Sequence, residues 1–173
     1  LWYARNASER DLPLSVGAQP WYPIAVREAA VMAEGTAVLD LSPFAKFEIA
    51  GPDALAFLQR LACAGLDVAP GRAVYTPLLN DRGGIEADVT ILRRAADRFR
   101  LTSGAATRWR DGAWLRRHAR GLDVSVTDMT ESEAVIGVMG AGARGLLAGI
   151  SGDDWRDFAF STGRPVTVAG EGC

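Results

Sequence analysis

The chain has 173 residues, 49% of them hydrophobic and 23% charged, and its formal net charge is −2. These values are ordinary for a folded domain, and they exclude the overall basic field that draws proteins to nucleic acid. No apolar run approaches the roughly 20 residues that cross a bilayer, so we expect no membrane span. Two cysteines and one histidine exclude a disulfide framework and a multi-histidine metal site. We therefore expect a cytoplasmic protein without a bound metal.

Residues 1–23 are rich in Trp, Tyr, Pro and polar residues and have no regular period. We expect them to form an extended arm that lies over a neighbouring surface. The chain starts at Leu1 instead of Met, and it stops directly after a strand-like run at 165–168. We therefore expect residues 24–173 to be the N-terminal portion of a larger domain that is incomplete at its C-terminus.

From residue 24 onward the pattern predicts regular elements separated by turn residues. Expected helices lie at 24–35, 53–61, 105–120 and 143–150, with a short one near 154–155. Expected strands lie at 37–42, 45–49, 73–80, 85–93, 97–103, 122–127, 133–139 and 164–168. We expect the strand at 133–139 to be buried and Trp109 and Ala113 to share one face of their helix. This order predicts an α+β fold with mixed, mostly antiparallel sheets and packed helices.

The hairpin at 73–93 carries the most informative residue, Asp88. Paired glycines at 83–84 suit a tight turn, and carboxylates are depleted from strand interiors. Alternation puts Ile85, Ala87, Val89 and Ile91 on one face and Asp88 on the other, with Glu86, Thr90 and Leu92. Asp88 therefore either pairs with an arginine of the strand at 97–103 or lies at the floor of a pocket, where it orients a ligand or a proton.

Two other groups of charged residues have both a structural and a functional interpretation. Lys46 lies mid-strand between Phe44 and Phe47, and we expect it to pair with a carboxylate or else to line a pocket. The helix at 105–120 carries five arginines and His118. That helix presents either a solvated face or a docking patch for an anionic tail or a partner subunit.

A series of motifs in fixed order closely resembles one family. The series is DLSPFAKF at 40–47, GPDA at 51–54, FLQRL at 57–61, PGR at 70–72, YT at 75–76 and LNDRGGIEADVT at 79–90. It is similar to the folate-binding aminomethyltransferase domain of the glycine cleavage T-protein. The motifs FAKF and GGIEADVT are most similar to those of the branch fused to dimethylglycine and sarcosine dehydrogenases.

The resemblance implies an enzyme that transfers an aminomethyl or methylene carbon from an N-methylglycine-type amine to tetrahydrofolate. It implies that Asp88 is catalytic and contacts the folate, that Tyr75 lies near the same pocket, and that Asn80 belongs to the folate site and shapes its turn. It also implies a flavin dehydrogenase domain or subunit as partner, with FAD bound outside this chain.

One segment departs from the family pattern. An Asn-Asp pair is usual after the first long helix, and this chain has Ala64-Gly-Leu-Asp67 there. This departure keeps two alternatives open: a relative that uses a different methyl acceptor, and a structural remnant that docks an oxidase. A folate-binding or docking module without one-carbon chemistry is a third alternative.

Overall fold

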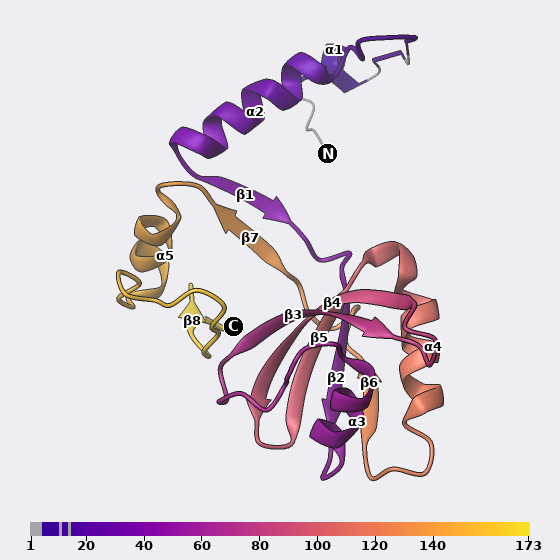
Figure 1. Ribbon diagram of the computed structural model, residues 1–173. Coiled ribbons are helices and arrows are strands. Elements are labelled where there is room, and N and C mark those ends of the chain that lie inside the picture. Colours follow the sequence, from indigo (N-terminus) through magenta and orange to yellow (C-terminus); the bar gives the residue numbers. More distant parts are fainter. Residues whose placement is uncertain (1–4, 11, 14) are drawn as a thin grey trace. The chain divides into compact units, whose positions relative to one another are not determined.

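The computed structural model describes residues 5–10, 12, 13 and 15–173 (Figure 1). These residues form two compact units. The first comprises the chain up to Leu39 with Gly137–Arg156 and Val168–Glu171, and the second comprises Asp40–Ile136, Asp157–Thr167 and Gly172–Cys173. None of the helices within the described ranges is both long and apolar enough to traverse a lipid bilayer.

The second unit is built on a five-stranded sheet in the order β3-β4-β5-β2-β6. Each strand runs antiparallel to its neighbours. The strands are β2 (Ala45–Ala50), β3 (Ala73–Leu79), β4 (Ile85–Ala95), β5 (Arg98–Ser103) and β6 (Ser125–Asp128). Short hairpins connect β3 to β4 and β4 to β5, which explains why these strands are neighbours in both sequence and space.

One face of this sheet packs against two helices, α3 (Ala54–Leu61) and α4 (Arg108–His118), which a short 3-10 turn, η1 (Ala105–Thr107), precedes (Figure 1). The alternation of β2 and β5 supplies Phe47, Ile49, Phe99 and Leu101, all fully buried. The helices contribute a matching apolar set, which consists of Ala54, Phe57, Leu58 and Leu61 of α3 and Leu115 of α4. The hydrophobic core of the unit therefore lies between the sheet and its helices.

The opposite face of the sheet carries polar side chains. The register aligns Tyr75 with Thr90, Thr90 with Thr102, and Thr102 with Lys46, so these four residues form one row across four strands. Asp88 lies two residues before Thr90 on β4, so its side chain is the next one on this same face of the strand. The sheet thus separates an apolar core from a polar surface.

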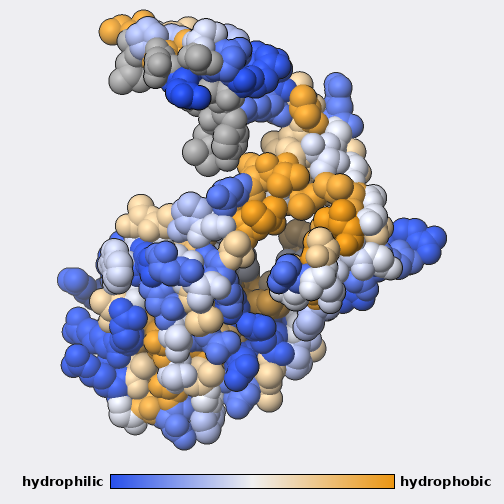
Figure 2. Space-filling model, turned by 180° about the vertical axis from the view of Figure 1, so that it is seen from behind, coloured by the Kyte–Doolittle hydropathy of each residue, from blue (hydrophilic) through white to orange (hydrophobic). Residues whose placement is uncertain are grey.

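The first unit contains α1 (Ala7–Arg10), α2 (Tyr22–Glu34), β1 (Ala37–Asp40), β7 (Ile136–Met139) and α5 (Ala143–Ser151), and β1 pairs with β7. Two residues each form β8 (Thr167–Val168) and β9 (Glu171–Gly172), which also pair. A two-stranded sheet buries few apolar side chains by itself. Accordingly, Val38, Met139, Leu146 and Ile150 are exposed, and Figure 2 shows apolar side chains gathered on this part of the surface.

The structure confirms the α+β class and the antiparallel order of the hairpin at 73–93 and the next strand. Several element predictions are wrong. No helix forms near residues 154–155, where Trp155 lies in a turn region, buried with its Nε1 donating to the Ser151 hydroxyl at 2.9 Å. The strand at 133–139 shortens to β7 and is not buried.

Two predictions about buried faces are also wrong. Ile85 is exposed, because the register shifts by a β-bulge between Leu78 and Leu79 at that end of the hairpin. Trp109 and Ala113 face solvent, because α4 buries Asp111, Gly112 and Leu115 instead. In the region 1–23, expected to be an extended arm, the described residues include α1 and the start of α2; Trp2 and Tyr3 lie outside the described residues.

Gly51, between β2 and α3, gives a testable stability prediction. Its φ is +136°, and a Cβ added there would lie 2.4 Å from the backbone oxygen of Asp123. We expect Gly51→Ala to lower the free energy of unfolding by about 2 kcal/mol or more, because a backbone clash adds to the strain of a positive φ. Gly83→Ala is the matched control, with φ +76° and open space around it. Urea unfolding should show a clearly smaller loss, about 1 kcal/mol, for the control.

Candidate functional site

Asp88 lies in the open part of the polar sheet face. Its neighbours along β4, Ala87 and Val89, are buried in the core, whereas Asp88 itself is exposed. Pro77 lies directly opposite on β3 and has no N–H to donate. The buried neighbours Ala87 and Val89 therefore anchor β4 at this point, and the carboxylate of Asp88 stays accessible to a ligand.

The carboxylate of Asp88 is bound by a tyrosine. The hydroxyl of Tyr75 donates a hydrogen bond to Oδ2 of Asp88. This bond and the negative charge of Asp88 raise the pKa of the Tyr75 hydroxyl, so the phenol remains a proton donor above neutral pH. The alternative in which Asp88 pairs with an arginine of β5 is wrong in the described structure: Arg100 pairs with Glu133.

Asn80 shapes the turn that leads into β4. Its Oδ1 accepts hydrogen bonds from the backbone N–H groups of Arg82 and Gly84, at 3.0 and 2.9 Å. Its Nδ2 donates to Oε1 of Glu86 at 2.7 Å. Both ends of the amide are therefore engaged within the hairpin. By shaping the turn, Asn80 fixes the start of β4, the strand that carries Asp88.

Thr102 is a further polar residue of this surface, and no sequence motif indicates it. It lies beside Thr90 on the neighbouring strand. No hydrogen bond to either threonine side chain occurs among the residues that the structure describes. The site therefore offers a carboxylate, two hydroxyl groups and a phenol. Alternation of 97–103 places Thr102 on one face of its strand, but only the cross-strand register shows that it lies next to Thr90.

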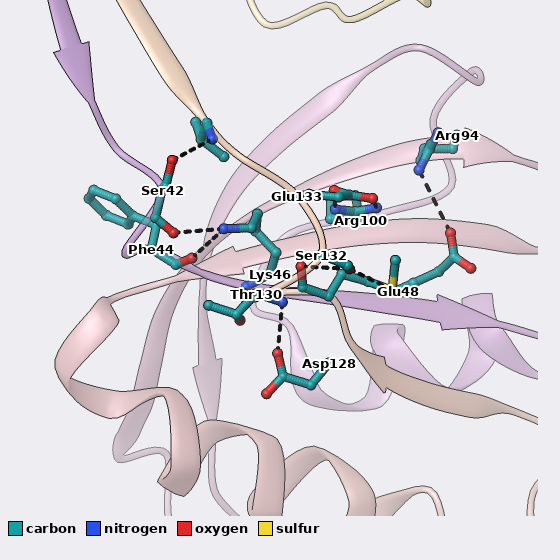
Figure 3. A network of polar contacts seen from close by, with 12 residues as sticks. Ser42, Phe44, Lys46, Glu48, Arg94, Arg100, Asp128, Thr130, Ser132 and Glu133 are labelled. Carbon is teal, nitrogen blue, oxygen red and sulfur yellow. Dashed lines mark hydrogen bonds and ion pairs between the residues drawn. The ribbon is translucent and has the colours of Figure 1, made fainter. Parts of the chain in front are cut away.

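A network of charged and polar groups occupies the other end of the same face (Figure 3). Arg100 binds both carboxylate oxygens of Glu133. Lys46 is 2% exposed, and its Nζ donates to the carbonyl oxygens of Ser42 and Phe44 at 2.8 and 3.0 Å. The expected carboxylate pair for Lys46 is therefore wrong. Its ammonium charge is satisfied by two backbone carbonyls and ties the turn before β2 to that strand.

The arginines of α4, together with Arg120 just after it, divide into two groups. Arg108 pairs with Asp128 and Glu131, and Arg110 with Asp111, so both are tied to the fold. Arg116, Arg117 and Arg120 are exposed and have no ion pair among the described residues. The first two lie in the last helical turn, where cations are favoured by the helix dipole. A solvated face explains this arrangement.

The segment that departs from the family pattern is held by the sheet. The N–H of Ala64 donates to the hydroxyl of Thr76 at 3.0 Å, and Leu66 is buried. Asp67 accepts a hydrogen bond from Arg93 at 2.6 Å. Asp67 therefore stabilises the loop after α3 by pairing with β4. No group of three or more His, Cys, Asp or Glu side chains in the described ranges is placed to hold a metal ion.

Among the carboxyl groups of this unit, Glu133 and Asp128 contribute a pH dependence to its stability. The hydrogen bond from Arg100 lowers the pKa of Glu133 below 4.5. Burial acts to raise the pKa of Asp128, but hydrogen bonds from Arg108 and Thr130 outweigh it and hold the pKa below 3.8. The pKa values of both carboxyl groups are lower in the folded state than in the unfolded chain. Their contribution to the free energy of unfolding is therefore complete above the unfolded pKa values, and it is lost as the pH falls through the folded pKa values.

We therefore expect the urea midpoint to be steady with respect to these two groups from about pH 7 to 5.5 and to fall as the pH decreases below about 4.5. The measurement is a series of urea titrations from pH 7 to pH 3. In Glu133→Gln the acid loss should be smaller, because this variant lacks one of the two groups. An identical acid loss in the variant would contradict the assignment to Glu133.

The whole chain, residues 1–173, matches the family model described as the GCVT N-terminal domain. It is 44% identical over 170 residues to a 4-methylaminobutanoate oxidase (formaldehyde-forming) of Paenarthrobacter nicotinovorans. This match covers 97% of this chain and 21% of that protein. It is 34% identical over 141 residues to an aminomethyltransferase of Alcanivorax borkumensis, which covers 81% of this chain and 37% of that protein. The chain thus spans between a fifth and two fifths of the length of these relatives.

Two solved structures share the fold. The glycine cleavage system aminomethyltransferase T of Bartonella henselae superposes with a TM-score of 0.75 at 25% identity, covering 88% of this chain and 40% of that one. The heterotetrameric sarcosine oxidase of Corynebacterium sp. U-96 superposes with a TM-score of 0.62 at 17% identity, covering 91% of this chain and 80% of that one. The expected aminomethyltransferase fold is therefore confirmed.

Proposed function

Because the chain belongs to the GCVT N-terminal domain family and is similar to domains of amine oxidases, we propose that it contributes the folate site of a one-carbon transferase. Tetrahydrofolate supplies the nitrogen nucleophile that accepts the carbon. The single observation that carries this proposal is Asp88, an accessible carboxylate between two buried residues of β4. A pterin presents N–H groups that such a carboxylate accepts, and the exposed ring of Tyr75 offers an aromatic surface beside it.

The donor in this proposal is an N-methylated amino acid of the N-methylglycine type. The relative from Paenarthrobacter nicotinovorans is named for 4-methylaminobutanoate, which is also a secondary N-methyl amine. Oxidation of such a methyl group yields an iminium, R–NH⁺=CH₂. Attack by one folate nitrogen on the methylene carbon forms a first C–N bond. The bond between that carbon and the amine nitrogen then breaks, and a second folate nitrogen bonds to the same carbon. The amine leaves as R–NH₃⁺ with the two protons that the folate nitrogens lose. The products are methylene-tetrahydrofolate and the amine.

Asp88 has two tasks in this reaction. By accepting a hydrogen bond it orients the folate toward the electrophilic carbon, which is catalysis by proximity. Its negative charge also stabilises the cation that develops at the attacking nitrogen. Thr90 and Thr102 supply nearby hydroxyl groups for further hydrogen bonds. The oxidation itself requires a flavin dehydrogenase domain or subunit, which we propose as the partner, with FAD bound there.

The first test is calorimetric titration of the full-length protein with 5-formyltetrahydrofolate, a stable folate, repeated with Asp88→Ala. We expect binding by the wild type and at least a tenfold loss in the variant, because a hydrogen bond to a charged group is removed. Circular dichroism of the variant serves as the folding control. No binding by the wild type would overturn the folate assignment and favour a docking role or a different acceptor of the methylene group.

A further inference from the structure

Tyr75 and Asp88 form a cross-strand diagonal pair. The register places Tyr75 opposite Thr90 and Pro77 opposite Asp88, so the two side chains are diagonal neighbours on the same sheet face. The Tyr75 side chain is 70% exposed, and core packing therefore does not determine its position. Within the described structure, the hydrogen bond to Asp88 is the polar contact that orients the phenol.

The bond distinguishes the two oxygens of the Asp88 carboxylate. Oδ2 accepts the proton of the Tyr75 hydroxyl, and Oδ1 accepts no hydrogen bond among the described residues. An exposed aspartate without such a bond rotates about its side-chain torsions. With Oδ2 held, the carboxylate plane is restricted and Oδ1 is the oxygen that remains for a ligand N–H.

We propose that Tyr75 is a positioning residue for Asp88: its hydroxyl holds Oδ2 so that Oδ1 accepts the ligand hydrogen bond. This inference rests on the folate site proposed above and deepens it by assigning the hydroxyl, as distinct from the ring, a role. The rival interpretation is that Tyr75 contributes only its ring to the ligand. Tyr75→Phe separates the two, because it keeps the ring and removes the hydroxyl.

A ligand-free measurement tests whether the bond exists. Phenolate absorbance near 295 nm is followed during alkaline titration of the wild type, Tyr75→Phe and Asp88→Ala. We expect the difference between wild type and Tyr75→Phe to isolate a tyrosine that ionises late. In Asp88→Ala, compared with the double variant, the same tyrosine should ionise at a lower pH, because the acceptor and its charge are gone. If Tyr75 ionises at the same pH in Asp88→Ala as in the wild type, the proposal is overturned.

A double-mutant cycle then tests the positioning role. Dissociation constants for 5-formyltetrahydrofolate, and kcat and KM for one-carbon transfer, are measured for Tyr75→Phe, Asp88→Ala and the double variant. We expect Tyr75→Phe to weaken binding by about tenfold in the wild-type background and to have almost no effect in Asp88→Ala, because the two groups act together. Tyr22→Phe, which removes an exposed phenol hydroxyl from α2, is the matched control and should change nothing.

Each other outcome contradicts the inference. Unchanged binding and kcat in Tyr75→Phe would leave only the ring-contact role. Full additivity in the double variant would show that the hydroxyl contacts the ligand independently of Asp88. If the wild type binds no folate, the proposed function fails and the positioning role fails with it, while the absorbance titration still shows whether the Tyr75–Asp88 bond forms.

Discussion

Asp88→Asn in the full-length protein is expected to reduce kcat for folate-dependent one-carbon transfer by about 10² to 10³-fold. The substitution keeps the size of the side chain and removes its charge. The amide can still accept a hydrogen bond, so some folate binding should survive, but it cannot stabilise the cation that forms at the attacking nitrogen. The effect should therefore be larger on kcat than on KM. Steady-state assays that follow methylene-tetrahydrofolate measure both constants.

Asp81→Asn is the matched control for this prediction. Asp81 is an exposed aspartate in the turn of the same hairpin, seven positions before Asp88. The control makes the same chemical change without altering the polar sheet face, so both kinetic constants should match those of the wild type. Equal activity of Asp88→Asn and Asp81→Asn would show that the reaction needs no charge at position 88. Oxidation of the amine, followed with an artificial electron acceptor, should proceed in all three proteins.

The hairpin and its carboxylate could be predicted from sequence because their signals are local. Alternation over 85–93 and the glycine pair at 83–84 both lie within one supersecondary element. The prediction fails at Ile85, where a bulge between Leu78 and Leu79 shifts the register. A bulge depends on how two strands pair, and the alternation of one strand does not reveal it.

The orientation of α4 could not be predicted for a different reason. Its buried face contains Asp111 and Gly112, and neither gives a hydrophobic signal. Asp111 is accommodated because the Thr107 hydroxyl donates to it at 2.6 Å, and Gly112 leaves room for the ring of Phe47. Hydrophobic periodicity instead predicts that Trp109 lies on the buried face. In the fold, Trp109 is exposed beside the guanidinium of Arg108. Tertiary contacts, which the helix sequence does not contain, decide the face.

The partner of Arg100 in the buried network could not be predicted from local patterns either. Position 46 occupies the same cross-strand row as Thr102, Thr90 and Tyr75, so the buried network and the candidate site share one sheet face. The segment after β6 supplies Glu133, which lies 33 residues beyond Arg100 in the chain. The sheet face is therefore closed by this segment at one end and open at Asp88, and both conditions depend on contacts between distant residues.

Glu133→Gln is expected to lower the free energy of unfolding by about 2 kcal/mol at pH 7. Arg100 is only 11% exposed, and one of its nitrogens, Nε, already lacks a hydrogen-bond partner in the described structure. Removing the charge of Glu133 leaves this guanidinium buried without a counter-ion, and breaking a buried pair typically costs about 3–5 kcal/mol. We expect less than that because Glu133 itself is 37% exposed. Urea unfolding at pH 7 measures the loss.

Glu131→Gln provides the matched control, since Glu131 pairs with Arg108 but is 83% exposed. A surface pair of this kind contributes about 1 kcal/mol or less, so the control should lose clearly less stability than Glu133→Gln. The double variant Arg100→Met, Glu133→Leu should recover most of the loss, because it removes the buried charge together with its partner. Equal losses for the two single variants would show that Arg100 retains access to water, and a double variant no better than Glu133→Gln would place the cost in packing instead of charge.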